Sequence, residues 1–152
     1  MTDSPKFAEL TVGSVIAERS YHLTRDSLVR YAGASGDFNP IHYRDDVAQE
    51  VGLQGVLAHG MLTMGVATTP VAEWLGDAGV ILDAQARFTR PVWVDAESGA
   101  TVEVKIAVNA LDPDARTAQF KIDTYFEGKT VLVKALVLVQ FFETDSPRQV
   151  SN

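Results

Sequence analysis

The chain has no cysteine, which excludes disulfide bonds and thiolate metal sites and is consistent with a reducing compartment. It also lacks the glycine-rich loops that hold nucleotide phosphates, so nothing in it supports a nucleotide cofactor. No apolar run approaches the ~20 residues of a membrane-spanning helix. The first six residues are polar and lack the apolar run of a secretion signal. We therefore expect a cytoplasmic protein without membrane insertion.

Basic residues are also few. The chain has 13 Lys and Arg against 20 Asp and Glu, a formal net charge of −7. This balance argues against a nucleic-acid partner, because binding to phosphates needs basic clusters. A phosphate-bearing substrate would need local basic spots, for which Arg44, Arg87 and Arg90 are candidates. For any one of these arginines, a solubilising surface role is the simpler interpretation.

What remains is an ordinary globular composition. The chain has 152 residues, 46% apolar and 22% charged, which fits one domain with a sizeable core. There is no internal repeat or linker. We expect a single domain over residues 1–152, with its core at about 8–142 and a polar, disordered tail after Glu143.

The first half of the chain carries helical signals. In order, the pattern predicts a loose arm over 1–14, a strand over 15–24 and helices over 25–34, 44–51 and 60–75. Thr24 is a suitable N-cap for the first helix. Gly33 and Gly36 are expected to end that helix, and Gly52 the second. The third helix is apolar nearly all round, which indicates burial, although Pro70 should kink it.

The second half changes to a period of two residues. Apolar and polar side chains alternate over 80–88, 101–108 and 118–126, and a more apolar run at 130–142 indicates a central strand. These are expected to be half-buried antiparallel strands with hairpin turns at 112–114 and 127–129. An antiparallel sheet curled around the apolar helix buries all of these surfaces. We therefore predict an α+β hot-dog fold, with an open sheet edge that favours a two-fold dimer.

A carboxylate and an imidazole stand five residues apart in Ser35-Gly36-Asp37-Phe38-Asn39-Pro40-Ile41-His42. Pro40 fixes its own φ and biases Asn39 to extended geometry, so both side chains can face one cavity. Such a pair can move a proton near neutral pH. The alternative is that Asp37 only caps the turn and His42 is a half-buried structural histidine.

A second glycine-marked turn, Ala58-His59-Gly60-Met61, opens the apolar helix. The first backbone N–H groups of a helix lack intrahelical partners and lie at its positive end, so the Gly60 N–H suits a developing oxyanion. For His59, packing or solvent exposure is the preferred interpretation. We assign His22 a structural role and expect no metal site, because three scattered histidines do not form one. Trp93 follows Pro91-Val92, where it can line an acyl tunnel.

These motifs resemble a known family. Residues 31–42, followed by Ala48, resemble the hydratase-2 signature of MaoC-like (R)-specific enoyl-thioester hydratases and dehydratases. Residues 58–62 and 87–92 are similar to further blocks of that family. One departure is that many members carry Pro-Gly-Asp after the strand that ends in Pro-Val, whereas this chain reads Trp93-Val94-Asp95 after Pro91-Val92, near the expected substrate entrance.

The resemblance implies an enzyme that interconverts trans-2-enoyl and (3R)-3-hydroxyacyl thioesters. Asp37 and His42 would be the catalytic pair and the Gly60 N–H the oxyanion donor, with no metal and no organic cofactor. Further candidates for substrate binding are Asn39, His59, Met61, Arg87 and Trp93. The substrate would be an acyl-CoA or an acyl carrier protein thioester, and the assembly a homodimer or a heterodimer with another hot-dog subunit. A thioesterase of the same fold, or a subunit that mainly supports a partner, are the alternatives.

Overall fold

The computed structural model describes residues 5–143, so the predicted disordered tail lies outside the described residues. The elements are η1 (Phe7–Glu9), β1 (Val15–Leu23), α1 (Arg25–Ser35), η2 (Pro40–His42), α2 (Asp45–Glu50), α3 (Gly60–Leu75), η3 (Gly76–Ala78), β2 (Gly79–Phe88), β3 (Ala100–Asp112), β4 (Thr117–Phe126) and β5 (Lys129–Phe141).

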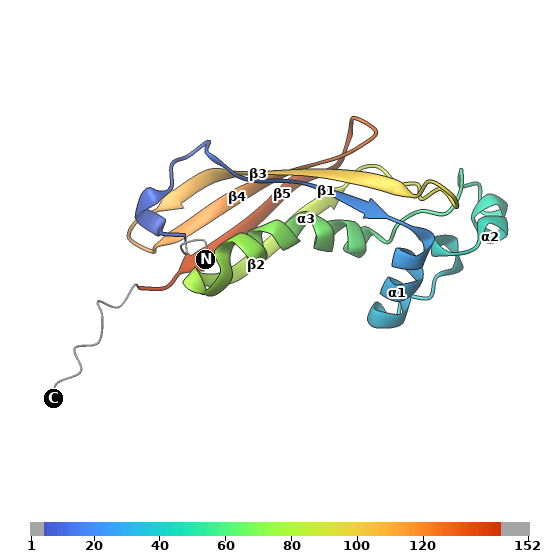
Figure 1. Cartoon of the computed structure of the whole chain (residues 1–152), viewed down its shortest axis with the longest axis horizontal. Helices are drawn as coiled ribbons and strands as arrows, with labels where there is room; N and C mark the ends of the chain where they lie inside the picture. Colours follow the sequence, from blue (N-terminus) through green and yellow to red (C-terminus); the bar gives the residue numbers. More distant parts are fainter. Residues whose placement is uncertain (1–4, 144–152) are drawn as a thin grey trace.

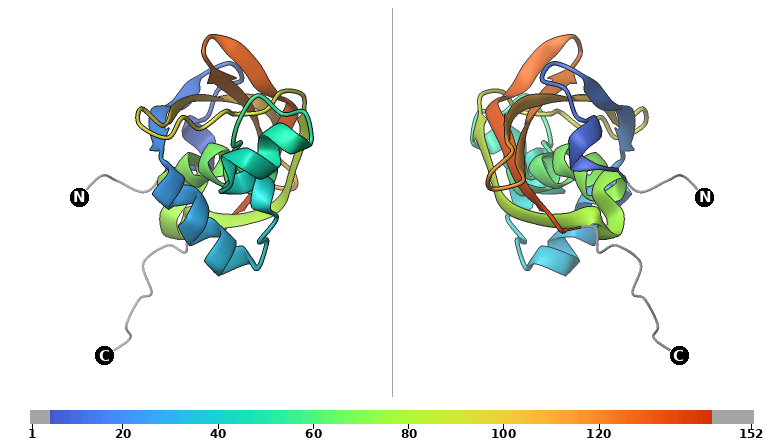
Figure 2. Two further views of the ribbon diagram at one scale, coloured as in Figure 1. Left: turned by 90° about the vertical axis from the view of Figure 1, so that its right-hand side faces the viewer. Right: turned by 90° about the vertical axis from the view of Figure 1, so that its left-hand side faces the viewer.

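The five strands form one antiparallel sheet in the order β1-β3-β4-β5-β2. The sheet curls around α3, as the end-on views of Figure 2 show. The helices α1 and α2 lie together at one end of the molecule, and η1 and the end of β5 lie towards the other (Figure 1). This is the predicted α+β hot-dog arrangement, and the long helix has the predicted bounds.

The core lies between the sheet and one face of α3. Alternate residues of β3 and β4 are buried, as their two-residue period predicts: Val102, Val104, Ile106, Val108, Ala118, Phe120, Ile122, Thr124 and Phe126. Phe120 is fully buried and contacts Trp74 edge-on, with ring centroids 5.4 Å apart. Truncating such a core aromatic to alanine typically costs ~3–5 kcal/mol.

Burial of α3 is one-sided, which corrects the prediction of a helix buried all round. Its buried residues are Thr63, Ala67, Pro70, Val71 and Leu75. Met61 on the other side is 59% exposed. The helix continues through Pro70 as one element. The apolar outer side of α3 is therefore uncovered in a single chain.

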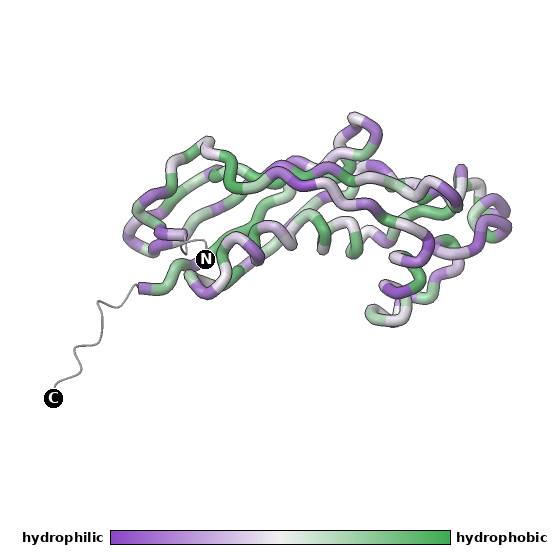
Figure 3. Tube along the Cα trace, in the orientation of Figure 1, coloured by the Kyte–Doolittle hydropathy of each residue, from purple (hydrophilic) through white to green (hydrophobic). Residues whose placement is uncertain are grey.

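The strand β2 departs from the prediction in the same way. It forms where the alternation indicates, but most of its residues are exposed, including Val80 (42%), Ile81 (38%) and Leu82 (54%). It pairs with β5 on one side and is an edge of the sheet on the other. Figure 3 shows hydrophobic colour along β2 as well as along the covered strands. The opposite edge strand, β1, carries Glu18 and Arg19 instead.

Smaller differences concern the ends of elements. The arm before β1 is not loose throughout, because η1 forms within it and Phe7 packs on the core, 5.7 Å from the ring of Phe141. Thr24 caps α1 as predicted, in a capping box with Ser27. Gly36 ends α1 in the left-handed conformation at φ 77°, whereas Gly33 lies inside the helix. None of the helices within residues 5–143 is long and apolar enough to cross a bilayer.

Candidate active site

Three side chains meet at the end of the molecule where α1, η2 and α3 converge. Asp37, His42 and His59 each place one side-chain oxygen or ring nitrogen within 4.8 Å of the other two. Asp37 is exposed, while His42 is 7% and His59 1% exposed. The structure thus brings together the carboxylate and imidazole that the sequence singled out. It also shows that His59 lies close to His42, although we expected the histidines to be scattered.

Local turns set the position of Asp37. Its N–H donates to Ser35 Oγ over 3.2 Å, and its Oδ1 accepts the N–H of Asn39 over 3.2 Å. Asn39 in turn caps η2, because its Oδ1 accepts the Ile41 N–H. Asp37 therefore does cap the turn, but with Oδ1. Within residues 5–143 its Oδ2 has no hydrogen-bond partner and can accept one from a bound molecule.

The tautomer of His42 follows from its surroundings. Its Nδ1 lies 2.8 Å from the carbonyl oxygen of Leu57. A carbonyl can only accept a hydrogen bond, so Nδ1 carries the proton in the neutral ring and Nε2 carries the lone pair. Leu57 itself is held by a bridge to Trp93, with the Ala58 N–H donating to Val92 O over 2.8 Å. The segment around Leu57 is therefore a short paired stretch that orients His42.

His59 is buried behind His42. The two imidazoles stack with centroids 3.8 Å and planes 23° apart, and the Tyr31 ring meets His59 edge-on at 4.9 Å. Burial lowers the pKa of His59 below its usual value, which favours the neutral ring. Its Nε2–H donates to the carbonyl oxygen of Asp37 over 3.1 Å. Its buried Nδ1 has no hydrogen-bond partner within the described part of the chain.

The nitrogen and oxygen donors of this cluster are of the kind that bind zinc. However, the lone pair of an imidazole nitrogen lies in the plane of its ring. Two rings stacked face to face therefore direct their lone pairs side by side rather than towards one ion. The geometry suits a hydrogen-bonded small molecule at His42 Nε2 and Asp37 Oδ2 better than joint coordination of a metal.

The N-terminus of α3 supplies free donors. His59 is the N-cap but gives no side-chain cap, and the first backbone bond of the helix runs from the Thr63 N–H to His59 O over 3.0 Å. The N–H groups of Gly60, Met61 and Leu62 have no partner among the described residues. Gly60 also packs closely, since a Cβ built there would lie 3.2 Å from the ring of Phe88.

A cavity of about 400 Å³ opens beside His42. It is lined by His42, Leu53, Leu57, Ala58, Gly60, Thr63, Phe88, Thr89, Arg90, Pro91, Val92, Trp93 and Leu132. His42 and Gly60 therefore face the same space, and Trp93 lies on its wall. This places a proton-transfer group, a helix N-terminus and an apolar wall around one ligand-sized volume.

Four of the predicted substrate-binding residues lie outside this lining: Asn39, His59, Met61 and Arg87. His59 is too buried to reach a ligand in the cavity. Met61 is exposed on the uncovered side of α3. Their proposed contacts with substrate are not supported by the cavity of a single chain. The sequence reasoning did not single out Phe88 or Leu132. The alternation of β2 indicated that Phe88 shares a face with its neighbours, but no local signal marked Leu132.

The three arginines considered for phosphate binding differ in their surroundings. Arg44 pairs with Asp46, and the hydrogen bond to that carboxylate raises the pKa of the guanidinium. Arg90 donates from a terminal nitrogen to Thr130 O over 2.9 Å and lines the cavity. Arg87 is exposed on β2. Arg90 is thus the arginine of this set that lies at the cavity.

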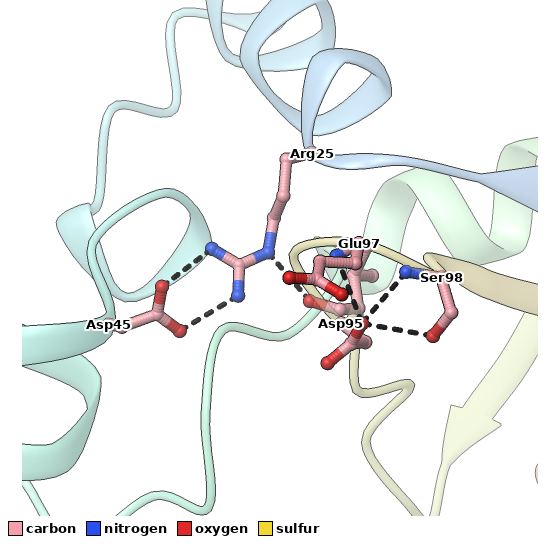
Figure 4. A network of polar contacts seen from close by, with 6 residues as sticks. Arg25, Asp45, Asp95, Glu97 and Ser98 are labelled. Atoms are coloured by element: carbon pink, nitrogen blue, oxygen red, sulfur yellow. Dashed lines mark hydrogen bonds and ion pairs between the residues drawn. The ribbon is translucent and has the colours of Figure 1, made fainter.

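Behind the site, Arg25 joins three segments (Figure 4). Its Nε donates to Val94 O over 2.6 Å, and its two terminal nitrogens donate to Asp45 over 2.9 and 2.8 Å. The hydrogen bond to Arg25 lowers the pKa of Asp45. Asp95 accepts from the N–H groups of Glu97 and Ser98, which orders the next turn. The network fixes α1 and α2 against the segment that carries Trp93.

The comparison with known families decides the classification. The MaoC-like domain matches residues 6–120, about three quarters of the chain. The chain belongs to the MaoC-like domain family. The match includes Asp37, His42, His59 and Gly60, and the whole cavity lining except Leu132.

Similar proteins within and around this family carry related names. The (R)-specific enoyl-CoA hydratase of Rhodospirillum rubrum is 28% identical over 111 residues, which cover 72% of this chain and 74% of that protein. The 3-hydroxybutyryl-CoA dehydratase of Methylorubrum extorquens is 29% identical over 143 residues, 93% of this chain and 88% of that protein. A solved structure described as a MaoC-like dehydratase superposes with a TM-score of 0.84 at 34% identity. That match covers 91% of this chain and 42% of the longer chain.

Proposed function

We propose that this protein is a hydro-lyase that interconverts trans-2-enoyl and (3R)-3-hydroxyacyl thioesters. The observation that carries the proposal is the cluster of Asp37 and His42, whose side chains each place a polar atom within 4.8 Å of the other, beside a cavity that His42 and Gly60 line. The names of the related hydratases and dehydratases support the same reaction.

The pair acts on one water molecule. In hydration, the two O–H groups of that water donate to Asp37 Oδ2 and His42 Nε2. These two hydrogen bonds direct the water oxygen at C3 of the enoyl chain. As the C3–O bond forms, one proton passes to the pair and a proton is delivered to C2, so water is added across the double bond. Dehydration reverses these steps. General acid–base help of this kind is typically worth ~10²–10⁴ in rate.

The thioester oxygen needs a separate partner. Negative charge builds on it when C3 is attacked, and the Gly60 N–H, at the positive end of α3, is placed to stabilise that charge. Loss of one oxyanion donor typically costs ~10²–10³ in rate. The apolar wall at Trp93 and Phe88 would hold the acyl chain, and Arg90 lies where a phosphate-bearing carrier could be met. Coenzyme A and acyl carrier protein thioesters both fit this description.

We further propose that the working form is a dimer joined at β2. This strand combines an unpaired edge with exposed apolar side chains, whereas β1 is protected by charged residues. The helix α3, whose outer side is uncovered, packs against β2 as well as against β1. The second chain would be another copy or a different hot-dog subunit, and native mass spectrometry of the protein expressed alone separates these two cases.

The reaction is tested by following the loss of enoyl-thioester absorbance with purified protein. The assay uses acyl chains of several lengths on both carriers and determines the chirality of the 3-hydroxy product. Asp37→Asn and His42→Ala are expected to lower kcat by at least ~10²-fold while leaving the fold intact by circular dichroism. His22→Gln is the matched control, because His22 lies on β1 away from the cavity.

Three outcomes would contradict the proposal. The wild-type protein could hydrate no enoyl thioester, the product could be the (3S) alcohol, or His42→Ala could keep full activity. Release of free thiol from the same substrates, detected with a thiol reagent, would instead indicate a thioesterase.

A further inference from the structure

His59 connects the two members of the proposed catalytic pair. Its ring stacks on His42, and its Nε2–H binds the peptide carbonyl of Asp37. We propose that His59 is a positioning residue, which holds the Asp37 and His42 side chains at the separation that one bound water requires. This inference rests on the proposed hydratase function but makes a separate claim about the geometry of the pair.

The hydrogen bonds around Asp37 show why such a brace is needed. The bonds that Asp37 makes to Ser35 and Asn39 stay within two residues of it in the sequence. They shape the turn but do not fix where the turn lies relative to the rest of the fold. Among the described residues, the bond to His59 spans 22 positions and is the one that ties Asp37 to a distant element. Without it, the turn after α1 keeps local bonds, such as that from the Tyr43 hydroxyl to Phe38 O, but Asp37 loses its hydrogen bond to the N-terminus of α3.

His42 is held in a complementary way. The Leu57 carbonyl fixes the edge of its ring, which sets the tautomer. That bond leaves rotation about its own axis open, and His59 blocks this rotation by covering one face of the ring. His59 is supported from behind by Tyr31. Because His59 is 1% exposed and lies outside the cavity lining, it does this without touching the substrate.

The composition of the His59 site agrees with a positioning role. A residue needed only for packing would be served by an apolar ring, since the buried Nδ1 of His59 has no hydrogen-bond partner in the described chain. Leaving a polar atom buried and unpaired is unfavourable for stability. The described chain gives Nδ1 nothing to bind, and the hydrogen bond from Nε2–H to Asp37 O is what the imidazole provides and an apolar ring does not.

Two variants separate the two contacts. His59→Phe keeps a ring against His42 but loses the donor to Asp37, whereas His59→Gln keeps a donor near the Nε2 position but loses the ring. Because a small misplacement of reacting groups can cost ~10²-fold, we expect each variant to lower kcat by about 10- to 100-fold. KM should stay within about 2-fold of wild type, since His59 makes no substrate contact. Thermal unfolding of both variants, with His22→Gln as the control, establishes that they fold.

A second readout does not depend on activity. Ring ¹⁵N shifts of His42 should report one protonated and one unprotonated nitrogen in the wild type and in His59→Phe. In His59→Gln, the bond to Leu57 should keep this tautomer, but the ring signals should broaden because the ring is free to rotate about that bond.

Wild-type kcat in both variants, or an unchanged His42 spectrum in His59→Gln, would overturn the positioning role. If the wild-type protein hydrates no substrate, the proposed function fails, and the His42 spectra still decide whether His59 orders the pair.

Discussion

Gly60 lies against the aromatic ring of Phe88, so closely that a methyl group on its Cα would come within 3.2 Å of Phe88 Cε1. The contact joins the N-terminus of α3 to the end of β2, and both residues line the cavity. Gly60→Ala should therefore push the Phe88 ring by a few tenths of an ångström without removing the backbone N–H. We expect kcat/KM to fall about 10-fold, because rate is sensitive to the alignment of the substrate.

The stability change in Gly60→Ala should stay below ~1 kcal/mol, since the half-exposed Phe88 ring can give way and alanine favours helix. Gly65→Ala in the same helix is the matched control, because nothing lies within 4 Å of its added Cβ. That control should keep full activity and gain up to ~1 kcal/mol in unfolding free energy. Steady-state kinetics and urea unfolding measure both effects. Unchanged kcat/KM in Gly60→Ala would show that the contact with Phe88 does not matter.

Burial of His59 makes folding stability depend on pH. Its pKa is lowered from 6.5 in the folded protein, so between the two values the unfolded chain binds more protons at this residue. The His59 contribution to stability is therefore complete above about pH 6.5 and is lost as the pH falls below it. We expect the wild type to lose more unfolding free energy between pH 7.5 and pH 5 than His59→Phe, which has no proton to bind there.

Urea unfolding of both proteins at intervals of half a pH unit tests this. Equal slopes of unfolding free energy against pH would mean that His59 does not titrate differently on folding.

The ties made by Arg25 should matter more than those of an ordinary surface ion pair. Arg25→Ala removes a hydrogen bond to Val94 O as well as the paired contact with Asp45, and should cost about 1–2 kcal/mol. Asp26→Asn breaks the exposed pair with Arg30 and should cost less than ~0.5 kcal/mol. Urea unfolding at pH 7 distinguishes them, and equal losses would refute the special role of Arg25.

Arg25→Ala should also change how the unfolding free energy depends on pH in the acidic range. Because Arg25 lowers the pKa of Asp45, the stabilisation from this carboxylate is present above its unfolded value of 3.8 and is lost as the pH falls through the lower folded value. Arg25→Ala should therefore unfold with a shallower pH dependence in that acidic range than the wild type.

The edge strand gives a prediction about assembly. Leu82→Lys places a charge on β2 at a position that is 54% exposed in a single chain, so it should hardly destabilise that chain. If two sheets join at β2, however, the lysine should break the pairing and the protein should run as a monomer in size-exclusion chromatography with light scattering. Val12→Lys, at a similarly exposed position outside the strands, should leave the native mass unchanged. A monomeric wild type would contradict the dimer.

Much of the fold could be predicted from local signals. The capping box at Thr24, the glycine after α1 and the alternation in β3 and β4 are each enforced by neighbours in sequence, and the structure agrees with them. Burial of whole elements could not be predicted in this way. The apolar composition of β2 and of the outer side of α3 indicated burial, but a single chain offers nothing to cover them. The apolar composition of β2 and α3 indicates that these surfaces are covered, but it does not show which chain covers them.

The candidate site also has a part that the sequence predicts and a part that it does not. Asp37 and His42 stand five residues apart on a restricted backbone, so their meeting followed from the sequence. The role of His59 did not, because it depends on a stacked contact across 17 positions and on the carbonyl of Asp37. Likewise, the Leu57 carbonyl that sets the His42 tautomer is a backbone atom, and the residue type at position 57 carries no signal for it.

Phe88 is both the last residue of the open edge strand and part of the cavity wall. Any chain that docks along β2 will therefore also touch the cavity beside His42. Specific activity should then rise with protein concentration until the paired form saturates. A different neighbour at this edge would change which acyl lengths are accepted while leaving Asp37 and His42 unaltered, so that one catalytic subunit could serve more than one substrate.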